Sequence, residues 1–304
     1  MKCELSRIVL EDLGAVRIVG ADAVRFLQGQ LSNDMLRLGE ERSVLAGYHN
    51  AQGRTFALMR LVHLGEAELL AVLPRELATP LCQRLAKYVL RAKVTLTDVS
   101  ADWRISGLAA RADLELGEPE ATPPDLPAAR TGAQRRNAER LYVTVSERPV
   151  RWLEIAAHRG EDAGVNGAAR EQWRALDIRA ALPQVYLATA EQFVAQMLNL
   201  DALDAIAFDK GCYSGQDVIA RAHYRGRVKR RAQPFRSLAP AELAPGQSGV
   251  LGDGRPFTVV DAARLPDGRC EFLAVAPLSP AEETNGATPR LAAEPLERPY
   301  PLSD

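Results

Sequence analysis

The sequence predicts an α+β protein that ends in a small β-barrel. Short runs of alternating apolar and polar residues, which are typical of strands, recur through the first half of the chain. Amphipathic helical patterns, such as residues 171–180, interrupt these runs. After Arg231, prolines and glycines separate short strands, which is the pattern of a barrel or sandwich. We therefore expect one region of two α/β subdomains over 1–231, and a barrel with an extended tail over 232–304.

Bulk composition narrows the class of protein. The chain has 304 residues, 47% of them hydrophobic, which is enough for two or three domains with real cores. A net charge of −1 provides no general attraction to nucleic acid or to membranes. No apolar stretch reaches membrane-spanning length, and charged residues interrupt the N-terminal segment where a signal peptide would be apolar. The four cysteines form no C-x-x-C pair, as expected for reduced thiols. These features predict a cytoplasmic protein with no membrane partner.

The elements of the first third follow from local signals. Residues 8–19 read as two strands around a turn near Gly14, and Asp22 is placed to cap a short helix. Strands over 45–61 are joined at Asn50-Ala51-Gln52-Gly53-Arg54, where Asn and Gly predict a hairpin turn.

The remaining elements continue this mixed pattern. Pro74 suits the first turn of a helix whose apolar stripe includes Cys82, which is therefore expected to be plain core. Prolines without periodicity predict a loop or linker over about 111–137. Further strands are expected at 69–73, 94–96, 103–108, 141–145, 152–156, 257–260 and 270–275.

Residues 209–231 carry the strongest functional signal. Ser214 and Asp217 have the spacing of a capping box, so a helix is predicted to begin near Gly215 and to stop near Gly226. Val218, Ile219 and Ala222 would form the buried face of that helix.

Cys212 would then lie in a turn just before a helix N-terminus, close to Lys210. The helix dipole and the cation both favour the thiolate, which is the form of cysteine that reacts or binds metal. A lone cysteine is more often a small buried apolar residue. Lysine, two glycines, cysteine, tyrosine, glutamine and an acid within eight residues are, however, too polar for a core segment. We therefore interpret this stretch as functional.

The motif Lys210-Gly211-Cys212-Tyr213-Ser214-Gly215-Gln216-Asp217 closely resembles the K-G-C-Y-x-G-Q-E signature of the YgfZ family of folate-binding proteins. These proteins are relatives of the glycine-cleavage T-protein, an aminomethyltransferase. Asp217 stands where the family usually has glutamate. Residues 26–34, 173–183 and 193–201 resemble further blocks of the same families. The resemblance implies a T-protein-like folate-binding fold.

The resemblance also implies a site and its partners. Tetrahydrofolate, or another reduced folate, is the expected cofactor, and Cys212 is expected to have the catalytic role, with no resident metal. Cys212 would act as a transient cluster ligand, as a redox partner or as a protector of the folate. Iron–sulfur client enzymes or cluster-assembly proteins are the expected partners, including an enzyme that methylthiolates tRNA. The expected folate contacts are Trp173, Lys210, Gly211, Tyr213, Gly215, Gln216, Asp217, Arg221 and Arg225, although a helical tryptophan such as Trp173 is equally good core material.

Two alternatives remain open at this stage. A folate-dependent aminomethyl or one-carbon transferase shares the fold, but the T-protein has an aspartate shortly after the hairpin turn, and residues 53–58 contain no acid. An accessory factor is therefore favoured over a transferase. An RNA-binding module could use the basic run 221–231, although such a run is more often a solvated face or an anion site. Its cations are Arg221, Arg225, Arg227, Lys229, Arg230 and Arg231.

Overall fold

The computed structural model describes residues 4–114, 118–120, 126–137, 139–160, 166–226, 228–279 and 289–302. By its internal contacts the chain divides into two compact units. The first contains residues 1–48, 57–170 and 205–214, and the second contains 49–56, 171–204 and 215–304. No single point in the sequence separates the two units, because the chain passes between them several times. The predicted domain boundary after residue 231 therefore stays a prediction. None of the described helices is long and apolar enough to cross a membrane.

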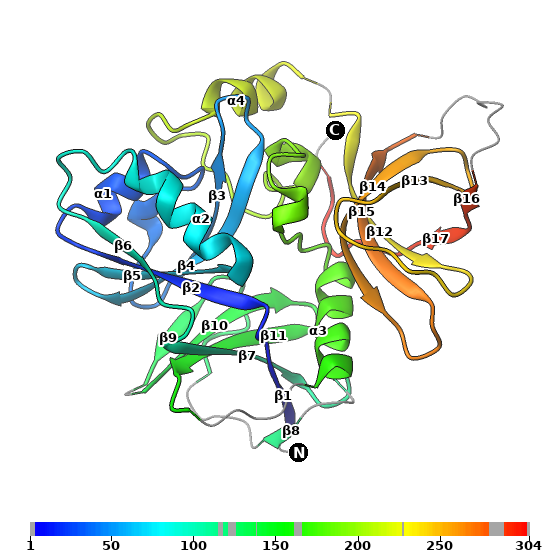
Figure 1. Cartoon of the computed structure of the whole chain (residues 1–304), viewed down its shortest axis with the longest axis horizontal. Coiled ribbons are helices and arrows are strands. Elements are labelled where there is room, and N and C mark those ends of the chain that lie inside the picture. The colour runs from blue at the N-terminus through cyan, green and yellow to red at the C-terminus, as the bar shows by residue number, and fades with distance from the viewer. Residues whose placement is uncertain are drawn as a thin grey trace. The chain divides into compact units, whose positions relative to one another are not determined.

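One sheet of the first unit has the strand order β3-β4-β5-β2-β6. Helix α2 packs on β2, β5 and β6 (Figure 1). Its Leu77, Leu81 and Leu85 are buried. The predicted hairpin at 50–54 is confirmed, and it joins β3 to β4. The elements are β2 (Leu13–Val19), α1 (Ala23–Gln28), η1 (Met35–Arg37), β3 (Val44–His49), β4 (Thr55–Gly65), β5 (Glu68–Pro74), α2 (Arg75–Ala86) and β6 (Thr95–Asp98).

The other sheet of this unit has the order β8-β1-β7-β11-β10-β9, and its neighbouring strands are antiparallel. Its strands are β1 (Leu5–Val9), β7 (Trp103–Ala110), β8 (Glu118–Glu120), β9 (Gln134–Arg136), β10 (Arg140–Glu147) and β11 (Val150–Ala157). The segment 111–137 is therefore not loop throughout, because β8 and β9 form the two edges of the sheet. Three-residue edge strands carry no apolar alternation that the sequence could reveal.

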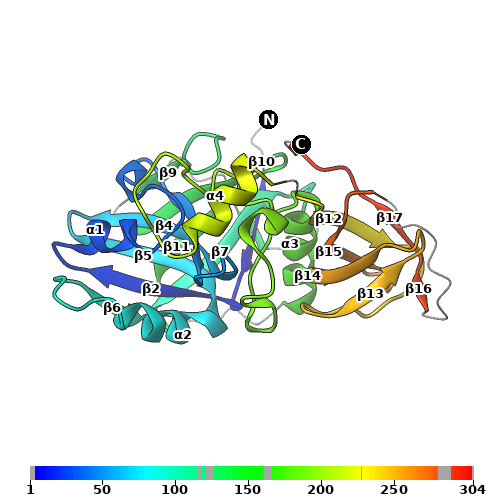
Figure 2. The same cartoon turned by 90° about the horizontal axis from the view of Figure 1, so that it is seen from above.

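The second unit contains most of α3 (Gly167–Arg179), together with η2 (Leu187–Thr189), η3 (Ala195–Leu198) and α4 (Gln216–Tyr224). Its sheet has the order β16-β13-β14-β15-β12-β17. The strands are β12 (Arg230–Ser237), β13 (Ser248–Leu251), β14 (Pro256–Arg264), β15 (Cys270–Pro277), β16 (Arg290–Leu291) and β17 (Ala293–Pro295). Figure 2 shows this sheet with β16 and β17 at the end of the chain.

The C-terminal sheet is a nearly closed barrel. Strands β16 and β17 lie at opposite edges of the sheet, yet only Ala292 separates them in sequence. The two edges must therefore come together at that residue. Phe235 and Phe257 each pack on Phe272 inside, with ring centroids 5.4 and 5.6 Å apart. The predicted α+β class with a C-terminal barrel is confirmed, whereas the tail is not simply extended, because residues 290–295 pair with β12 and β13.

The first turn also lies elsewhere than predicted. Residues 11–12 form it, and Gly14 is inside β2. A side chain at Gly14 would collide with the hydroxyl of Ser100 and with the backbone of Arg75. The glycine therefore serves close packing and not the turn.

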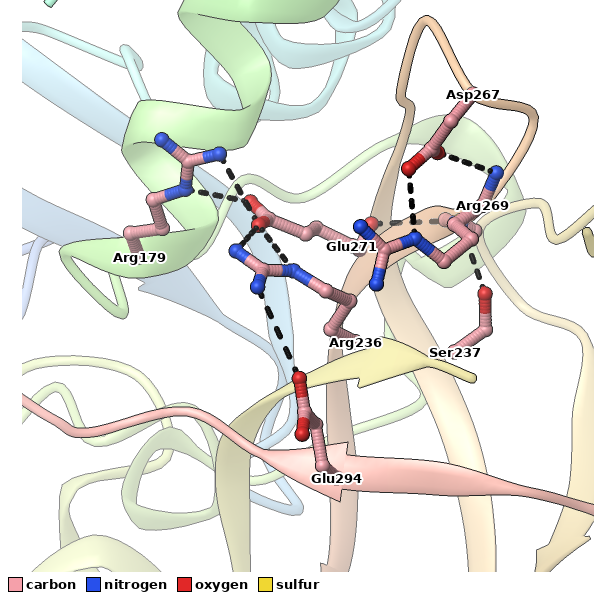
Figure 3. Close-up of polar contacts among 8 residues, drawn as sticks. Arg179, Arg236, Ser237, Asp267, Arg269, Glu271 and Glu294 are labelled. Carbon is pink, nitrogen blue, oxygen red and sulfur yellow. Dashed lines mark hydrogen bonds and ion pairs between the residues drawn. The ribbon is translucent and has the colours of Figure 1, made fainter. Parts of the chain in front are cut away.

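A buried carboxylate joins α3 to the barrel (Figure 3). The Glu271 side chain on β15 is 0% exposed and accepts hydrogen bonds from Arg179 of α3 at 2.7 and 3.1 Å. Arg236 of β12 donates to the same carboxylate at 2.6 and 3.0 Å. Arg236 also lies 3.7 Å from Glu294, whose side chain is 49% exposed. Two guanidinium groups thus compensate the cost of burying this charge.

We predict that Glu271→Gln lowers the free energy of unfolding by about 2–4 kcal/mol, because it leaves two guanidinium groups without their carboxylate. Glu294→Gln is the matched control, since it removes an exposed carboxylate from the same Arg236, and it should cost about 0–1 kcal/mol. Urea denaturation measures both values. Equal losses for the two variants would contradict the assignment of Glu271 as the main joint.

Candidate functional site

A polar turn after α1 organises the part of the site that lies in the first unit. The Ser32 hydroxyl donates to the carbonyl of Ala205 at 2.7 Å and accepts from the amide of Gly47 at 2.9 Å. The Asn33 amide donates to the carbonyl of Leu45 at 2.8 Å. The turn therefore ties β3 to the segment that leads to the cysteine motif.

Lys210 fastens the motif to the same turn. Its Nζ donates to the carbonyls of Gln28, Leu31 and Asn33 at 2.7, 2.7 and 2.8 Å. Carbonyls at a helix C-terminus lack partners inside the helix and attract cations. Because an ammonium group has three protons, these bonds occupy all its donors. Nζ also lies 5.2 Å from the ring centroid of Tyr213, within the range of a cation–π contact.

Two effects act on the charge of Lys210. Burial lowers its pKa to about 8, and the nearby carboxylate of Asp34 opposes that shift. The ammonium form therefore predominates at pH 7, and it is the form that can donate all three bonds. The expectation that Lys210 contacts a cofactor stays a prediction, but its described role is to hold the loop.

Cys212 is exposed on the loop that Lys210 holds, and so is Gly211, whereas Tyr213 is buried. Burial raises the pKa of the Cys82 thiol and that of the Cys270 thiol to about 11, so both are protonated at pH 7. Among the cysteines that the structure describes, Cys212 is exposed, Cys82 is half-buried and Cys270 is buried. Cys3 lies outside the described residues.

The rest of the motif belongs to the second unit, where α4 begins. The predicted capping box is wrong, because the N-cap residue is Gly215, with φ +80°, and no side chain caps the helix. A side chain at Gly215 would collide with the carbonyl of Asn50. Gly53, with φ +70°, leaves room for Val218 and Ile219 in the same way. Glycines in the hairpin turn and at the helix start thus allow their close approach.

Helix α4 has one buried contact and an exposed charged side. Ile219 is buried, but Val218 is 38% exposed, so the predicted buried face is wrong at Val218. Asp217, Arg221 and Arg225 are exposed and follow one another at four-residue spacing. Gln216 is half-buried at the start of the helix.

The basic run does not continue as one cationic surface. Arg231 is buried and makes a bidentate ion pair with Asp201 at 2.8 and 2.9 Å, so its assignment to a cationic surface is wrong. Arg230 is half-buried, whereas Lys229 is exposed. Arg227 lies outside the described residues. The RNA-binding alternative loses part of the surface on which it depended.

Trp173 and Glu191 also belong to this unit. Trp173 lies on α3 and is 5% exposed. Glu191 has a left-handed backbone, φ +60°, which is rare without a functional or packing reason. Its carboxylate accepts from the Asn50 side chain at 3.1 Å, and its amide donates to the carbonyl of Thr55 at 2.8 Å. Sequence reasoning missed Glu191, because nothing local marks it, and only the fold brings it to the hairpin turn.

No group of three or more histidine, cysteine, aspartate or glutamate side chains within the described ranges is arranged to hold a metal ion.

We predict that Lys210→Met lowers the free energy of unfolding by about 2 kcal/mol, because three carbonyls lose their shared donor. Lys210→Arg should not restore it, since a planar guanidinium cannot replace the compact ammonium between converging carbonyls. Hydrogen exchange should also accelerate at the amides of residues 210–213. Lys229→Met, at an exposed site, should stay within about 0.5 kcal/mol. Unchanged stability and exchange in both Lys210 variants would contradict the holding role.

Comparison with known proteins tests the resemblance. No family model matches the chain. The "tRNA-modifying protein YgfZ" of Serratia proteamaculans is 33% identical, over 99% of this chain and 94% of the relative. The protein of that name from Escherichia coli O127:H6 is 32% identical, over 87% of this chain and 83% of the relative.

The fold has a counterpart among solved structures. The glycine cleavage system aminomethyltransferase T from Bartonella henselae matches with a TM-score of 0.60 at 14% identity, covering 91% of this chain and 79% of that one. The predicted T-protein-like fold is therefore confirmed. The identity to the curated relatives extends over nearly the whole chain, and the chain accordingly belongs to the family of the tRNA-modifying protein YgfZ.

Proposed function

We propose that the protein binds a reduced folate and supports the synthesis or repair of iron–sulfur clusters in client enzymes, including enzymes that methylthiolate tRNA. The observation that carries the proposal is the exposed thiol of Cys212 on a loop held by Lys210. The name of the relatives supports a role in tRNA modification, and the likeness to an aminomethyltransferase supports a folate ligand.

The second unit has groups that suit both ends of a folate. Exposed Arg221 and Arg225 suit the anionic glutamate end. Thr55 Oγ1 and Gln196 Oε1 are buried without hydrogen-bond partners among the described residues, and they could accept from the N–H groups of a pterin. Trp173 offers little ring surface in its present packing, so stacking on the pterin would require the ring to be uncovered. A reduced folate supplies a carrier of one-carbon units.

A single cysteine such as Cys212 limits how the protein could take part in iron–sulfur cluster chemistry. Iron–sulfur clusters require about four protein ligands, and one thiolate cannot hold a cluster alone. Cys212 would therefore act as a transient ligand, as a redox partner or as a protector of the folate. All three roles require a thiol that a partner can reach, which Cys212 provides.

The folate half of the proposal is tested by titration. Tetrahydrofolate at about 100 times its dissociation constant should stabilise the protein by about 2.7 kcal/mol and raise its melting temperature. Reversing Arg221 and Arg225 to glutamate should weaken the binding of polyglutamylated folate, more so at low salt. Arg159→Glu, at a side chain that is 72% exposed, is the control and should leave affinity unchanged. The absence of any thermal shift at millimolar ligand would reject folate binding.

The cysteine half is tested by complementation. Cys212→Ser should keep the melting temperature, because an exposed turn cysteine packs little, but it should fail to restore tRNA methylthiolation in cells that lack the protein. Mass spectrometry of tRNA nucleosides measures the restoration. Cys82→Ser is the control and should restore it. Full restoration of tRNA methylthiolation by Cys212→Ser would contradict a functional role for this thiol.

The second candidate is a folate-dependent aminomethyl or one-carbon transferase. Glu191 favours it, because it places a carboxylate against the hairpin turn where the sequence alone offered none. Turnover of an aminomethyl donor with tetrahydrofolate, lost in Glu191→Gln but retained in Cys212→Ser, would establish the transferase in place of the cluster role.

A further inference from the structure

One face of the β8-β1-β7-β11-β10-β9 sheet carries a cluster of charged residues. In one row across the strands, Ala156 lies opposite Arg104 on one side and opposite Arg140 on the other. In the next row, Glu154 lies between Ser106 and Tyr142. Residues directly opposite one another point to the same face, with Cβ atoms about 5 Å apart. The small side chain of Ala156 therefore leaves space between two arginines.

One arginine of this cluster stands apart from its ion pairs. The Glu154 side chain is 3% exposed, and its Oε2 accepts from Arg7 at 2.9 Å and from Arg140 at 3.0 Å. Among the described residues, nothing forms a hydrogen bond or ion pair with the side chain of Arg104. Arg104 is thus left without the carboxylate that Arg7 and Arg140 share. A partly buried cation without a counter-ion is costly, which indicates that an anion is missing.

Three donor groups on this face point to the same conclusion, two of them in these rows and the third, on Trp152, in the row beyond Glu154. Arg104 Nη2, the Ser106 hydroxyl and Trp152 Nε1 are buried atoms that have no hydrogen-bond partner within the described ranges. Ser106 as a whole is 1% exposed. All three groups can donate, and each unpaired buried donor costs about 1–3 kcal/mol. The group that would satisfy the neighbouring Arg104 and Ser106 together is an acceptor with several oxygen atoms.

We propose that this face binds a small oxyanion, a phosphate or carboxylate group, over Ala156 between Arg104 and Arg140. The Ser106 hydroxyl, diagonal to Ala156, would supply a further hydrogen bond, and the planar guanidinium of Arg104 would bind two oxygen atoms at once. The Arg140 side chain is 40% exposed, which gives a ligand access from solvent. The site uses elements other than those that carry Cys212, and it does not depend on the proposed function.

The test compares melting temperatures in inorganic phosphate and in chloride at equal pH and ionic strength. Phosphate should raise the melting temperature of the wild-type protein by about 2–4 °C if it is well above its dissociation constant. Arg104→Gln should abolish the rise and should not lower the melting temperature in chloride, because it removes an unpaired cation. Arg135→Gln is the matched control, since Arg135 lies opposite Tyr142 on the same face but is exposed, and it should keep the rise.

Two further measurements complete the test. Ser106→Ala removes one donor with little change in volume, so it should weaken phosphate binding several-fold in calorimetry even if Arg104→Gln folds poorly. Glutarate in place of phosphate distinguishes the two ligand sources, and a rise with either anion supports the site. The proposal is overturned if neither anion raises the melting temperature. It is also overturned if Arg104→Gln responds like the wild type, or if it loses stability in chloride as it would on breaking an internal ion pair.

Discussion

The contact of the Lys210 ammonium group with three main-chain carbonyls, one at the end of α1 and two just after it, is the interaction on which the first unit's part of the site depends. The polar turn that supplies these carbonyls also binds β3 and the segment at residue 205 through Ser32 and Asn33. Parts of the chain that are 177–182 residues apart in sequence therefore meet through main-chain oxygen atoms. Because the acceptors are backbone atoms, substitutions in the turn itself change this contact less than any change at Lys210.

Similar charge pairing recurs in the second unit. Asp201 accepts a bidentate bond from Arg231, and Glu271 accepts from two arginines, so each irregular segment or helix end is fixed to a strand by a charged hydrogen bond. Such pairs fix the relative positions of the elements more reliably than they add net stability. The cost of removing both charges from water cancels much of their electrostatic attraction. The arginines of the basic run consequently have different roles. Arg231 supports the fold, whereas Arg221 and Arg225 are available to a ligand or partner.

Local patterns in the sequence predicted the strands, the hairpin turn and the exposed cysteine, because alternation and turn residues report local conformation. They failed where a distant residue decides the outcome. The N-cap residue is Gly215 and not Ser214, and the Asn50 carbonyl leaves no space for a side chain at that position. Arg231 can be buried because it pairs with Asp201. That partner is thirty residues away in sequence, so no local pattern reveals it. Glu191 reaches the hairpin turn through the fold alone, so no window around the turn contains it.

The contrast between Cys212 and Cys270 shows what the cysteine motif achieves. The backbone amide of Cys270 donates to the Ser237 hydroxyl inside the barrel, and burial raises the pKa of its thiol to about 11, so this sulfur is protonated and inaccessible. Cys212 is positioned through its neighbours, because the hydrogen bonds of Lys210 and the burial of Tyr213 anchor the chain on both sides of it. Its own side chain, however, stays in solvent. A rigid backbone with an open thiol lowers the entropy cost of meeting a partner while leaving the sulfur free to depart. That combination suits a brief exchange with a client better than permanent metal binding, which would require further ligands around the sulfur.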